Sequence, residues 1–393
     1  MNRNLWLLAL CQGLFLTNNV SFIAINGLVG LSLAPAGWMA TLPVMAYVVG
    51  GALSTQAVAV TQGRFGRRGS FQLGLLVAIA SCLVCAVAAS TRSFWLLCAA
   101  TLVAGYYSAN AQLYRFAAAE LAALPAREKA VSLVMAGGLI GAVFGPNLAA
   151  GTRDLLGAPY VGVYLSLALV ALVGIGLMQA IQFPPAPPKA AGAGVGRPLG
   201  EIMRQPVFIV AASAGALSYG VMNLLMAATP IAMQQCGLPF SAAALVLEWH
   251  VIGMFAPGFF TGHLIRRFGI ERVMWSGVLL YLLCIGVALA GVELDKFLIS
   301  MLLLGLGWNF IFTGATTLAL KAYRPEERDR TQAAINFFQF VTLALTSFSS
   351  GLLVTTQGWT LLNWGSLAPT AIIAVALLWL RRAALHTHPA TPG

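Results

Sequence analysis

The stretch "RFGRR" at residues 64–68 lies between two long apolar runs, and "RFGIER" at residues 267–272 lies between two others, 203 positions further along the chain. A second pair of turns repeats at almost the same spacing. "PAREK" begins at Pro125 and "PEERDR" begins at Pro325, an offset of 200. Turns that recur at one spacing are typical of a duplicated structure, so we expect two halves with the same fold.

The composition is typical of a membrane protein. Of the 393 residues, 59% are hydrophobic and only 8% are charged, whereas soluble domains carry about 25% charged residues. Lys and Arg outnumber Asp and Glu by 22 to 11. These basic residues lie in short clusters between apolar runs, which is the pattern of membrane loops. We therefore expect no nucleic-acid partner.

The six cysteines do not indicate a metal site or a disulfide framework. Five of them fall in apolar runs, and these include the C-x-x-C pair Cys82 and Cys85. Small residues in such runs are usually packing residues. We expect no metal.

Twelve apolar runs are long enough to cross a bilayer, which takes about 20 residues. The first run continues to about residue 32 without a signal-peptide cleavage site, so we interpret it as a retained span. The expected spans are 5–32, 37–61, 70–90, 93–119, 130–151, 158–183, 206–233, 241–265, 273–292, 297–320, 332–355 and 359–380.

The longest break divides these spans six and six. It is rich in Pro, Gly and Ala, which indicates a linker. We expect an N-terminal six-helix bundle at 1–183, a cytoplasmic linker at 184–205, a C-terminal six-helix bundle at 206–382 and a cytoplasmic tail at 383–393.

The basic residues also predict the orientation. Of the 22 Lys and Arg residues, 18 fall in alternate segments on one side, three fall in loops on the other side, and Arg115 lies within a span. Because positive residues are retained on the cytoplasmic side, this distribution predicts a multi-pass protein of the inner (plasma) membrane with both termini in the cytoplasm.

This organisation resembles the major facilitator superfamily over essentially the whole chain. The turn after span two in that family reads Gly-x-x-x-Asp-Arg-x-Gly-Arg-Arg. Here "AVTQGRFGRR" (59–68) has Ala59 for the first glycine and Gly63 for the aspartate, and it matches at Arg64, Gly66, Arg67 and Arg68. The second copy keeps Gly262, Arg267 and Gly269 but has Arg266 in place of the aspartate.

The resemblance implies an all-α membrane protein of the MFS fold. Two six-helix bundles, related by pseudo-two-fold symmetry, would surround a central cavity and move a solute by alternating access. The gating residues that we expect from the repeated turn, from span four and from span five are Arg64, Gly66, Arg67, Arg115, Gly141, Gly145, Pro146, Arg267 and Gly269.

Span five contains "GAVFGPNLAAG" (141–151), which looks like the Gly-x-x-x-Gly-Pro motif of many exporters in this superfamily. Gly141 and Gly145 share one helix face and permit close helix approach, while Pro146 favours a bend. Two other exporter features are missing, because Thr101 stands where span four usually carries an Arg and span one has no acidic residue. Uptake and efflux both remain open.

Ionisable residues inside spans are functional candidates. Glu248 and His250 lie in span eight, two residues and about 200° apart, so they face different directions. We expect proton coupling through one of them, with Glu248 favoured; alternatively, one of them caps a helix or bonds across an interface. Arg115 lies near the inner end of span four, five residues before Glu120, and we expect an ion pair or a gate latch there.

Uncharged polar residues form stripes on single helix faces. In span one, Gln12, Asn19 and Asn26 repeat every seven residues, whereas Asn18 points about 100° away and is expected to make an interhelical hydrogen bond. The spans that carry stripes are those that line the cavity in the resembling family. The predicted cavity residues are Gln12, Asn19, Asn26, Tyr107, Asn110, Tyr114, Tyr219, Asn223, Trp308, Asn309, Thr313, Asn336 and Gln339.

Amide and aromatic side chains with few charges favour a neutral or weakly cationic solute with a flat or aromatic part. A vitamin-like heterocycle and a drug-like xenobiotic both fit. No metalloprotease, P-loop or nucleophile motif is present, so we predict a secondary transporter without a cofactor, not an enzyme, and a monomer coupled to protons. The alternative is a membrane receptor or assembly subunit of the same fold that binds a ligand without moving it.

Overall fold

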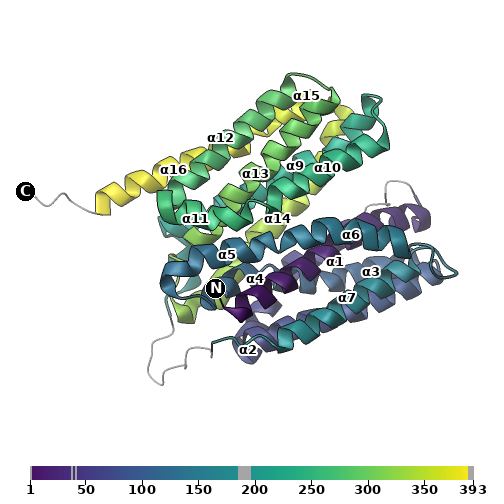
Figure 1. The fold of residues 1–393 in the computed structure, drawn as a ribbon, viewed down its shortest axis with the longest axis horizontal. Helices are drawn as coiled ribbons and strands as arrows, with labels where there is room; N and C mark the ends of the chain where they lie inside the picture. Colours follow the sequence, from purple (N-terminus) through teal and green to yellow (C-terminus); the bar gives the residue numbers. More distant parts are fainter. Residues whose placement is uncertain (1, 37–38, 40–41, 185–195, 388–393) are drawn as a thin grey trace, which may run out of the picture. The chain divides into compact units, whose positions relative to one another are not determined.

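The structure, a computed structural model, describes residues 2–36, 39, 42–184 and 196–387 (Figure 1). These residues are nearly all helical, and no strand occurs among them. All twelve predicted spans coincide with helices, some of them broken into two pieces. The all-α prediction is therefore confirmed. Parts of the predicted linker (185–195) and tail (388–393) lie outside the described residues.

By their contacts the helices form two units. Unit 1 comprises Met1–Pro188 together with Gln332–Ala344, and unit 2 comprises Lys189–Thr331 together with Leu345–Gly393. The stretch 332–344 belongs to a helix that begins and ends in unit 2. Residues 332–344 are thus the segment of the predicted C-terminal half that groups with unit 1.

Unit 1 contains the first six spans. Asn2 caps the first helix by accepting a hydrogen bond from the backbone N–H of Leu5 at 3.0 Å. Span four consists of α3 and α4, and span five consists of α5 and α6. The helices are α1 (Arg3–Leu33), α2 (Leu42–Ser90), α3 (Phe94–Ala111), α4 (Tyr114–Glu120), η2 (Leu124–Ala126), α5 (Arg127–Ala136), α6 (Gly138–Thr152) and α7 (Val161–Gln179).

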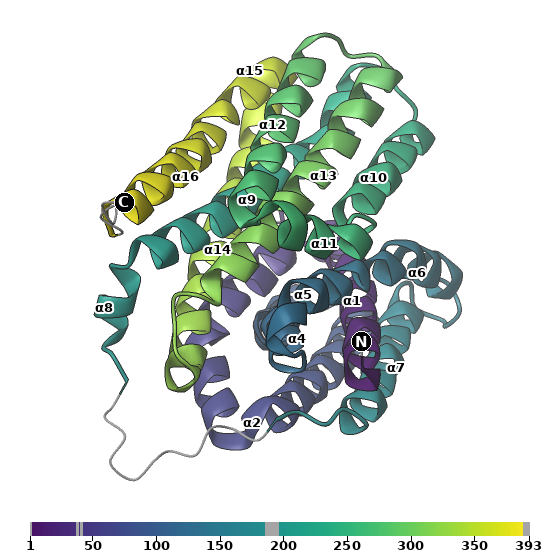
Figure 2. The same ribbon diagram turned by 60° about the vertical axis from the view of Figure 1, so that its left-hand side comes forward.

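Unit 2 contains the other six spans apart from residues 332–344 of span eleven, and α9 packs against both α13 and α16 (Figure 2). Pro206 opens α9, where a missing N–H has no cost. The helices are α8 (Leu199–Met203), α9 (Pro206–Gln235), α10 (Phe240–Phe255), α11 (Gly258–Phe268), α12 (Ile270–Leu289), α13 (Leu294–Ala319), η3 (Pro325–Glu327), α14 (Arg328–Thr356), α15 (Gly358–Gly365) and α16 (Leu367–Thr387).

The repeated basic turn reverses the chain in both units. Helix α2 has 49 residues, about 74 Å at 1.5 Å per residue, which is more than twice the roughly 30 Å hydrocarbon core of a bilayer. It is interrupted at Gly66, with φ 68° and ψ −178°, and Gly269 between α11 and α12 has φ 89°. Glycine adopts such positive φ values readily, so the glycine of "RFG" is what allows each reversal.

The second and fourth spans of each unit make a matching close contact. A β-carbon on Gly105 of α3 would lie 2.2 Å from the backbone nitrogen of Gly51 in α2. In unit 2, a β-carbon on Gly305 of α13 would lie 2.4 Å from the backbone oxygen of His250 in α10. Both helix pairs pack backbone to backbone, an arrangement that requires glycine.

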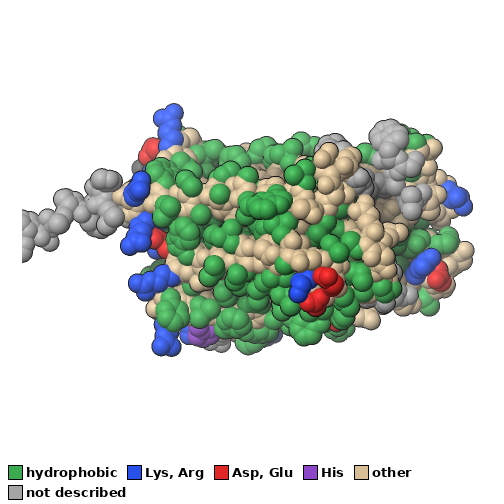
Figure 3. All heavy atoms as spheres, turned by 90° about the horizontal axis from the view of Figure 1, so that it is seen from above, with side chains coloured by type: hydrophobic (Ala, Val, Ile, Leu, Met, Phe, Trp, Pro, Cys, Tyr) green, Lys and Arg blue, Asp and Glu red, His purple; other side chains and the backbone are tan. Residues whose placement is uncertain are grey.

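The surface is suited to lipid. Eight helices in the described part of the chain are long and apolar enough to cross a membrane. Large apolar side chains stand exposed on these and other helices, for example Leu53 of α2 and Trp95 of α3, which are 70% and 63% exposed. On the face drawn in Figure 3, hydrophobic side chains cover most of the flank. Such a continuous apolar surface is stable only when it is covered, which here indicates a bilayer.

Candidate functional site

The polar stripe of α1 separates into two environments. Asn19 is half-buried and accepts a hydrogen bond from the Tyr47 hydroxyl at 2.8 Å. Asn26 has no exposed surface, donates to the Phe22 carbonyl and accepts from the Tyr164 hydroxyl, both at 2.8 Å. In this conformation the Asn26 amide holds α1 against α7. Gln12, on the same stripe, is also buried.

Asn18 and Tyr107 face a small cavity inside unit 1. Neither the Asn18 amide nor the Tyr107 hydroxyl has a partner with hydrogen-bond geometry among the described residues. The cavity leaves about 20 Å³ that the centre of a water-sized sphere can reach, far too little for an organic solute. It is lined by Asn18, Phe22, Tyr47, Ala78, Cys82, Ala104 and Tyr107.

Two asparagines connect the fourth span of their unit to neighbouring helices, Asn110 to α2 on both sides of the Gly66 kink and Asn309 to α10 and α11. Asn110 accepts from the Gln62 amide at 2.9 Å and donates to the Ser70 carbonyl at 2.7 Å. Asn309 accepts from the Thr261 hydroxyl at 2.7 Å and donates to the Met254 carbonyl at 2.6 Å. Both side chains are buried, so both amides are engaged in helix packing in this conformation.

Other predicted cavity residues lie against aromatic or polar neighbours. Tyr114 is buried and meets the rings of Phe15 and Phe71 edge-on. Asn223 of α9 is half-buried and donates to Ser347 at 2.9 Å in the unit 2 part of α14.

Unit 2 contains a group of four aromatic rings on α9, α10 and α13, which we call the aromatic group: Tyr219, Phe255, Trp308 and Phe312. The Trp308 ring stacks on Phe312 with centroids 4.8 Å apart, and it meets Tyr219 and Phe255 at 5.7 Å. Trp308 is buried, and its indole N–H has no acceptor within the described part of the chain. The buried Thr313 hydroxyl likewise has no hydrogen-bond partner among the described residues.

Glu248 and His250 point in different directions, as their spacing in α10 requires. His250 has no exposed surface, and its Nδ1 lies 2.8 Å from the Met301 carbonyl of α13. Glu248 is exposed, and so are its neighbours Leu245 and Trp249. The Glu248 side chain is therefore exposed, whereas His250 is held between two helices of unit 2.

The basic turn of unit 1 contains a buried ion pair. The Arg67 side chain is 1% exposed and its Nη2 lies 2.5 Å from Oε1 of Glu120 at the end of α4. The same guanidinium donates to Gln62 at 3.1 Å and to Gln332 at 2.8 Å. Although Gly63 replaces the family's aspartate, Arg67 thus has an anionic partner.

Arg115 is also buried and reaches the same segment of α14. Its Nη2 donates to Asn336 at 3.0 Å and to Gln339 at 2.8 Å, and its guanidinium lies 4.9 Å from the centre of the Phe116 ring. Asn336 and Gln339 are buried too. These two predicted cavity residues and one predicted gating residue therefore form one polar cluster.

The other predicted gating residues occupy two settings. Arg64 and Arg267 are exposed. Gly141 and Gly145 pack α6 against α1, where the Ser21 hydroxyl donates to the Gly145 carbonyl at 2.8 Å. Pro146 lies within α6.

No group of three or more His, Cys, Asp or Glu side chains that could hold a metal ion is found in the described ranges. Their cysteines are all free thiols.

Several residues of these clusters were not predicted from the sequence. Phe255 and Phe312 are apolar residues in apolar spans, so nothing distinguishes them from packing residues. We expected Glu120 to lie near Arg115, but in the structure it bonds to Arg67. The two residues are 53 positions apart, so no local pattern predicts their pairing. A search for an acid that could pair with the arginines of the basic turn would have identified this pair.

Two duplicated helical units with apolar flanks and buried polar clusters define a membrane transporter fold. The chain belongs to the Major Facilitator Superfamily, whose family description matches residues 5–346 and 211–393. The riboflavin transporter RfnT of Brucella anthropi is 39% identical over 379 residues, covering 96% of this chain and 95% of the relative. The predicted family is confirmed.

Solved structures show the same fold at low sequence identity. A double tryptophan mutant of XylE superposes with a TM-score of 0.81 at 15% identity, covering 98% of this chain and 96% of that one. FucP in its outward conformation gives 0.77 at 15% identity, with 96% and 97% covered. The protein is thus a membrane-spanning transporter of this superfamily.

Proposed function

We propose that the protein carries riboflavin or a closely related flavin across the plasma membrane. The relative in Brucella anthropi is a riboflavin transporter and matches nearly end to end. Riboflavin is uncharged at neutral pH, and it joins a flat three-ring system to a polyhydroxyl chain. It is therefore the kind of vitamin-like heterocycle that the amide and aromatic side chains of the spans favour.

The aromatic group of unit 2 is the observation that carries this proposal. Stacked and edge-on rings attract a further flat ring, typically by about 0.5–1.5 kcal/mol per contact. The buried N–H of Trp308 lacks an acceptor among the described residues, and the carbonyl oxygens of a flavin are acceptors. Asn223 of α9 lies one turn from Tyr219 and adds an amide suited to sugar-like hydroxyls.

Counterflow of labelled riboflavin in liposomes tests the substrate. Wild-type protein should exchange riboflavin, and Trp308→Leu should raise KM about tenfold because a stacking surface and a donor are lost together. Trp95→Leu is the control, since Trp95 is 63% exposed on the flank. Folded wild-type protein that neither binds nor exchanges riboflavin would refute the proposal.

Coupling to protons through Glu248 is the second part of the proposal. Glu248 is an exposed carboxylate in an apolar helix, and such residues mark ion pathways in membranes. Glu248→Gln should abolish accumulation driven by a proton gradient and leave counterflow intact. Glu293→Gln, an exposed acid outside the helices, should change neither. The sign of the gradient that drives accumulation gives the direction of transport.

We further propose that the protein works as a monomer, leaves its substrate chemically unchanged and has both termini in the cytoplasm. Labelling of single cysteines at the two ends in intact cells and in inverted vesicles tests the orientation. Labelling of either end from outside intact cells would reverse it.

A further inference from the structure

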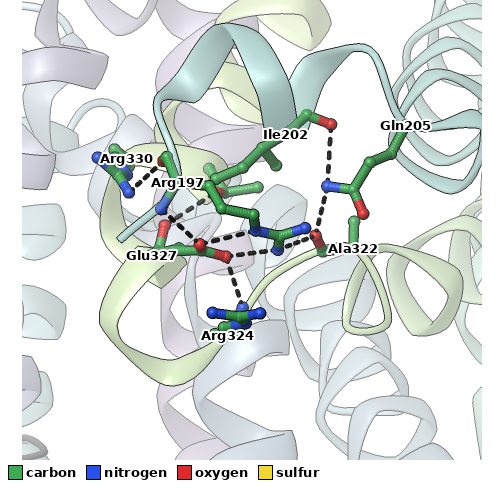
Figure 4. Close-up of polar contacts among 8 residues, drawn as sticks. Arg197, Ile202, Gln205, Ala322, Arg324, Glu327 and Arg330 are labelled. Atoms are coloured by element: carbon green, nitrogen blue, oxygen red, sulfur yellow. Dashed lines mark hydrogen bonds and ion pairs between the residues drawn. The ribbon is translucent and has the colours of Figure 1, made fainter. Parts of the chain in front are cut away.

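The described second part of the linker lies against the turn between α13 and α14 (Figure 4). The Arg197 guanidinium donates to both carboxylate oxygens of Glu327, at 2.9 and 2.7 Å, and the Arg197 backbone N–H donates to the same carboxylate at 2.9 Å. The backbone N–H of Arg324 donates to Glu327 at 2.9 Å. The Glu327 side chain has no exposed surface. One buried carboxylate therefore holds the linker and the turn together.

Backbone carbonyls extend this contact on both sides. Arg197 and Gln205 both donate to the Ala322 carbonyl, at 3.2 and 3.0 Å. Arg330 in turn donates to the Arg197 carbonyl. Since the bonds involve main-chain atoms of the linker and of the turn, they fix the path of both segments.

The ion pair is insensitive to ordinary changes of pH. Hydrogen bonds from Arg197, with smaller contributions from the backbone of Arg324, lower the pKa of the Glu327 carboxyl from 4.5 to about 2. The same pairing raises the pKa of Arg197. Both groups stay charged across the physiological range, so mechanical separation and not titration would open the contact.

Glu327 stands directly before a helix that both units share. Its backbone carbonyl accepts a bond from the Thr331 hydroxyl at 2.8 Å in the first turn of α14. The following stretch, Gln332–Ala344, packs in unit 1, where Gln332 accepts from Arg67 and Gln339 from Arg115. A helix is a rigid element, so the position of its first turn constrains the residues that follow.

We propose that Arg197 and Glu327 form a latch that positions α14 for the transport cycle. The second half of the linker is then a working part of unit 2 and not a passive tether. Both residues act through α14 and are positioning residues. This inference rests on the transporter fold and not on the identity of the substrate.

Hydrogen exchange of the full-length protein tests the latch without any substrate. Glu327→Gln should speed amide exchange about tenfold in residues 196–205 and 322–331, because the N–H groups of Arg197 and Arg324 lose a charged acceptor. If the latch positions α14, exchange in residues 332–344 should rise as well. Glu326→Gln is the matched control, since Glu326 is the exposed neighbour and should leave all three segments unchanged.

Transport separates positioning from a purely structural contact. Glu327→Gln should lower the maximal rate of counterflow about fivefold and leave KM within twofold of wild type. Arg197→Lys keeps the charge but loses the two-pronged geometry, so its rate should lie between the two. Arg197→Gln provides a second test if Glu327→Gln does not fold.

Each outcome decides the matter. Unchanged exchange in residues 196–205 and 322–331 would overturn the latch, and faster exchange confined to those segments would overturn its action on α14. A wild-type protein that ignores riboflavin would refute the proposed function, while the exchange measurements would still judge the latch.

Discussion

Each unit contains an ion pair with a buried member, but the residues that form the pair differ between the units. In unit 1 the cation belongs to the repeated turn, because Arg67 is 1% exposed and pairs with Glu120. In unit 2 the position of Arg67 in the repeat is occupied by Ile270, and Arg267, the counterpart of Arg64, is exposed. The buried acid Glu327 is paired there by Arg197 of the linker. The duplicated motif therefore marks a chain reversal in both units but a buried ion pair in only one of the two turns.

The helix contacts diverge far less. Gly105 packs on α2 in unit 1 as Gly305 packs on α10 in unit 2, with backbone atoms closer than a side chain allows. A steric requirement of this kind admits one residue type. A charge, in contrast, can be supplied from any nearby segment. Duplicated halves hence keep their packing glycines while their ion pairs change.

The largest expected effect tests this shared packing. Gly105→Ala and Gly305→Ala should each cost about 5 kcal/mol or prevent folding, because the added β-carbon would overlap backbone atoms. Gly176→Ala and Gly286→Ala are the controls, since open space surrounds both positions. Yield and melting temperature in detergent measure the effect. A collapse in only one unit would show that the contacts are not equivalent.

The basic turns should respond in opposite ways. Arg67→Ala removes a buried cation from Glu120 and should cost about 3–5 kcal/mol of stability. Arg267→Ala changes an exposed side chain and should stay within about 0.5 kcal/mol. Equal losses in chemical unfolding would contradict the asymmetry between the units.

Acid should weaken the ion pair of unit 2. Because folding lowers the pKa of Glu327 from 4.5 to about 2, its contribution is complete above pH 4.5 and disappears as the pH falls from 4.5 to 2. The loss is at most about 3 kcal/mol. Melting temperatures should be equal at pH 7 and pH 5 and lower at pH 3.5. If Glu327→Gln shows the same acid loss as wild type, other carboxyls are responsible.

The smallest expected effect concerns the two buried asparagines. Asn110→Ala and Asn309→Ala each remove at least two hydrogen bonds between the fourth span of a unit and neighbouring helix segments. Bonds between membrane helices contribute modestly, so each change should cost about 1 kcal/mol. Similar shifts in melting temperature would extend the likeness of the cores. A loss three times larger on one side would limit it to the glycine contacts.

The fold was predictable because apolar length and turn glycines are local signals. The twelve runs and the reversals at Gly66 and Gly269 depend on residues next to one another in the chain. The boundary between the units was harder to predict from the sequence. The grouping of residues 332–344 with unit 1 depends on contacts between residues far apart in the sequence, and no local pattern predicts it.

The candidate site was predictable in type but not in detail. A stripe shows that a helix face needs polar partners, yet a helix interface and a solute cavity both provide them. Asn19 and Asn26 share a stripe, but the amide nitrogen and oxygen of Asn26 both form hydrogen bonds to residues of unit 1. Substrate contact by these residues stays a prediction. The aromatic group combines three helices, so no single segment revealed it.

Helix α14 has a consequence for how this protein can be recombined. Because its middle belongs to unit 1 while its ends belong to unit 2, the two six-span halves are not interchangeable modules. A chimera joined at the linker would bring a foreign α14 to Arg67 and Arg115. Evolution by exchange of halves would have to carry this single helix, or its matching arginines, along with them.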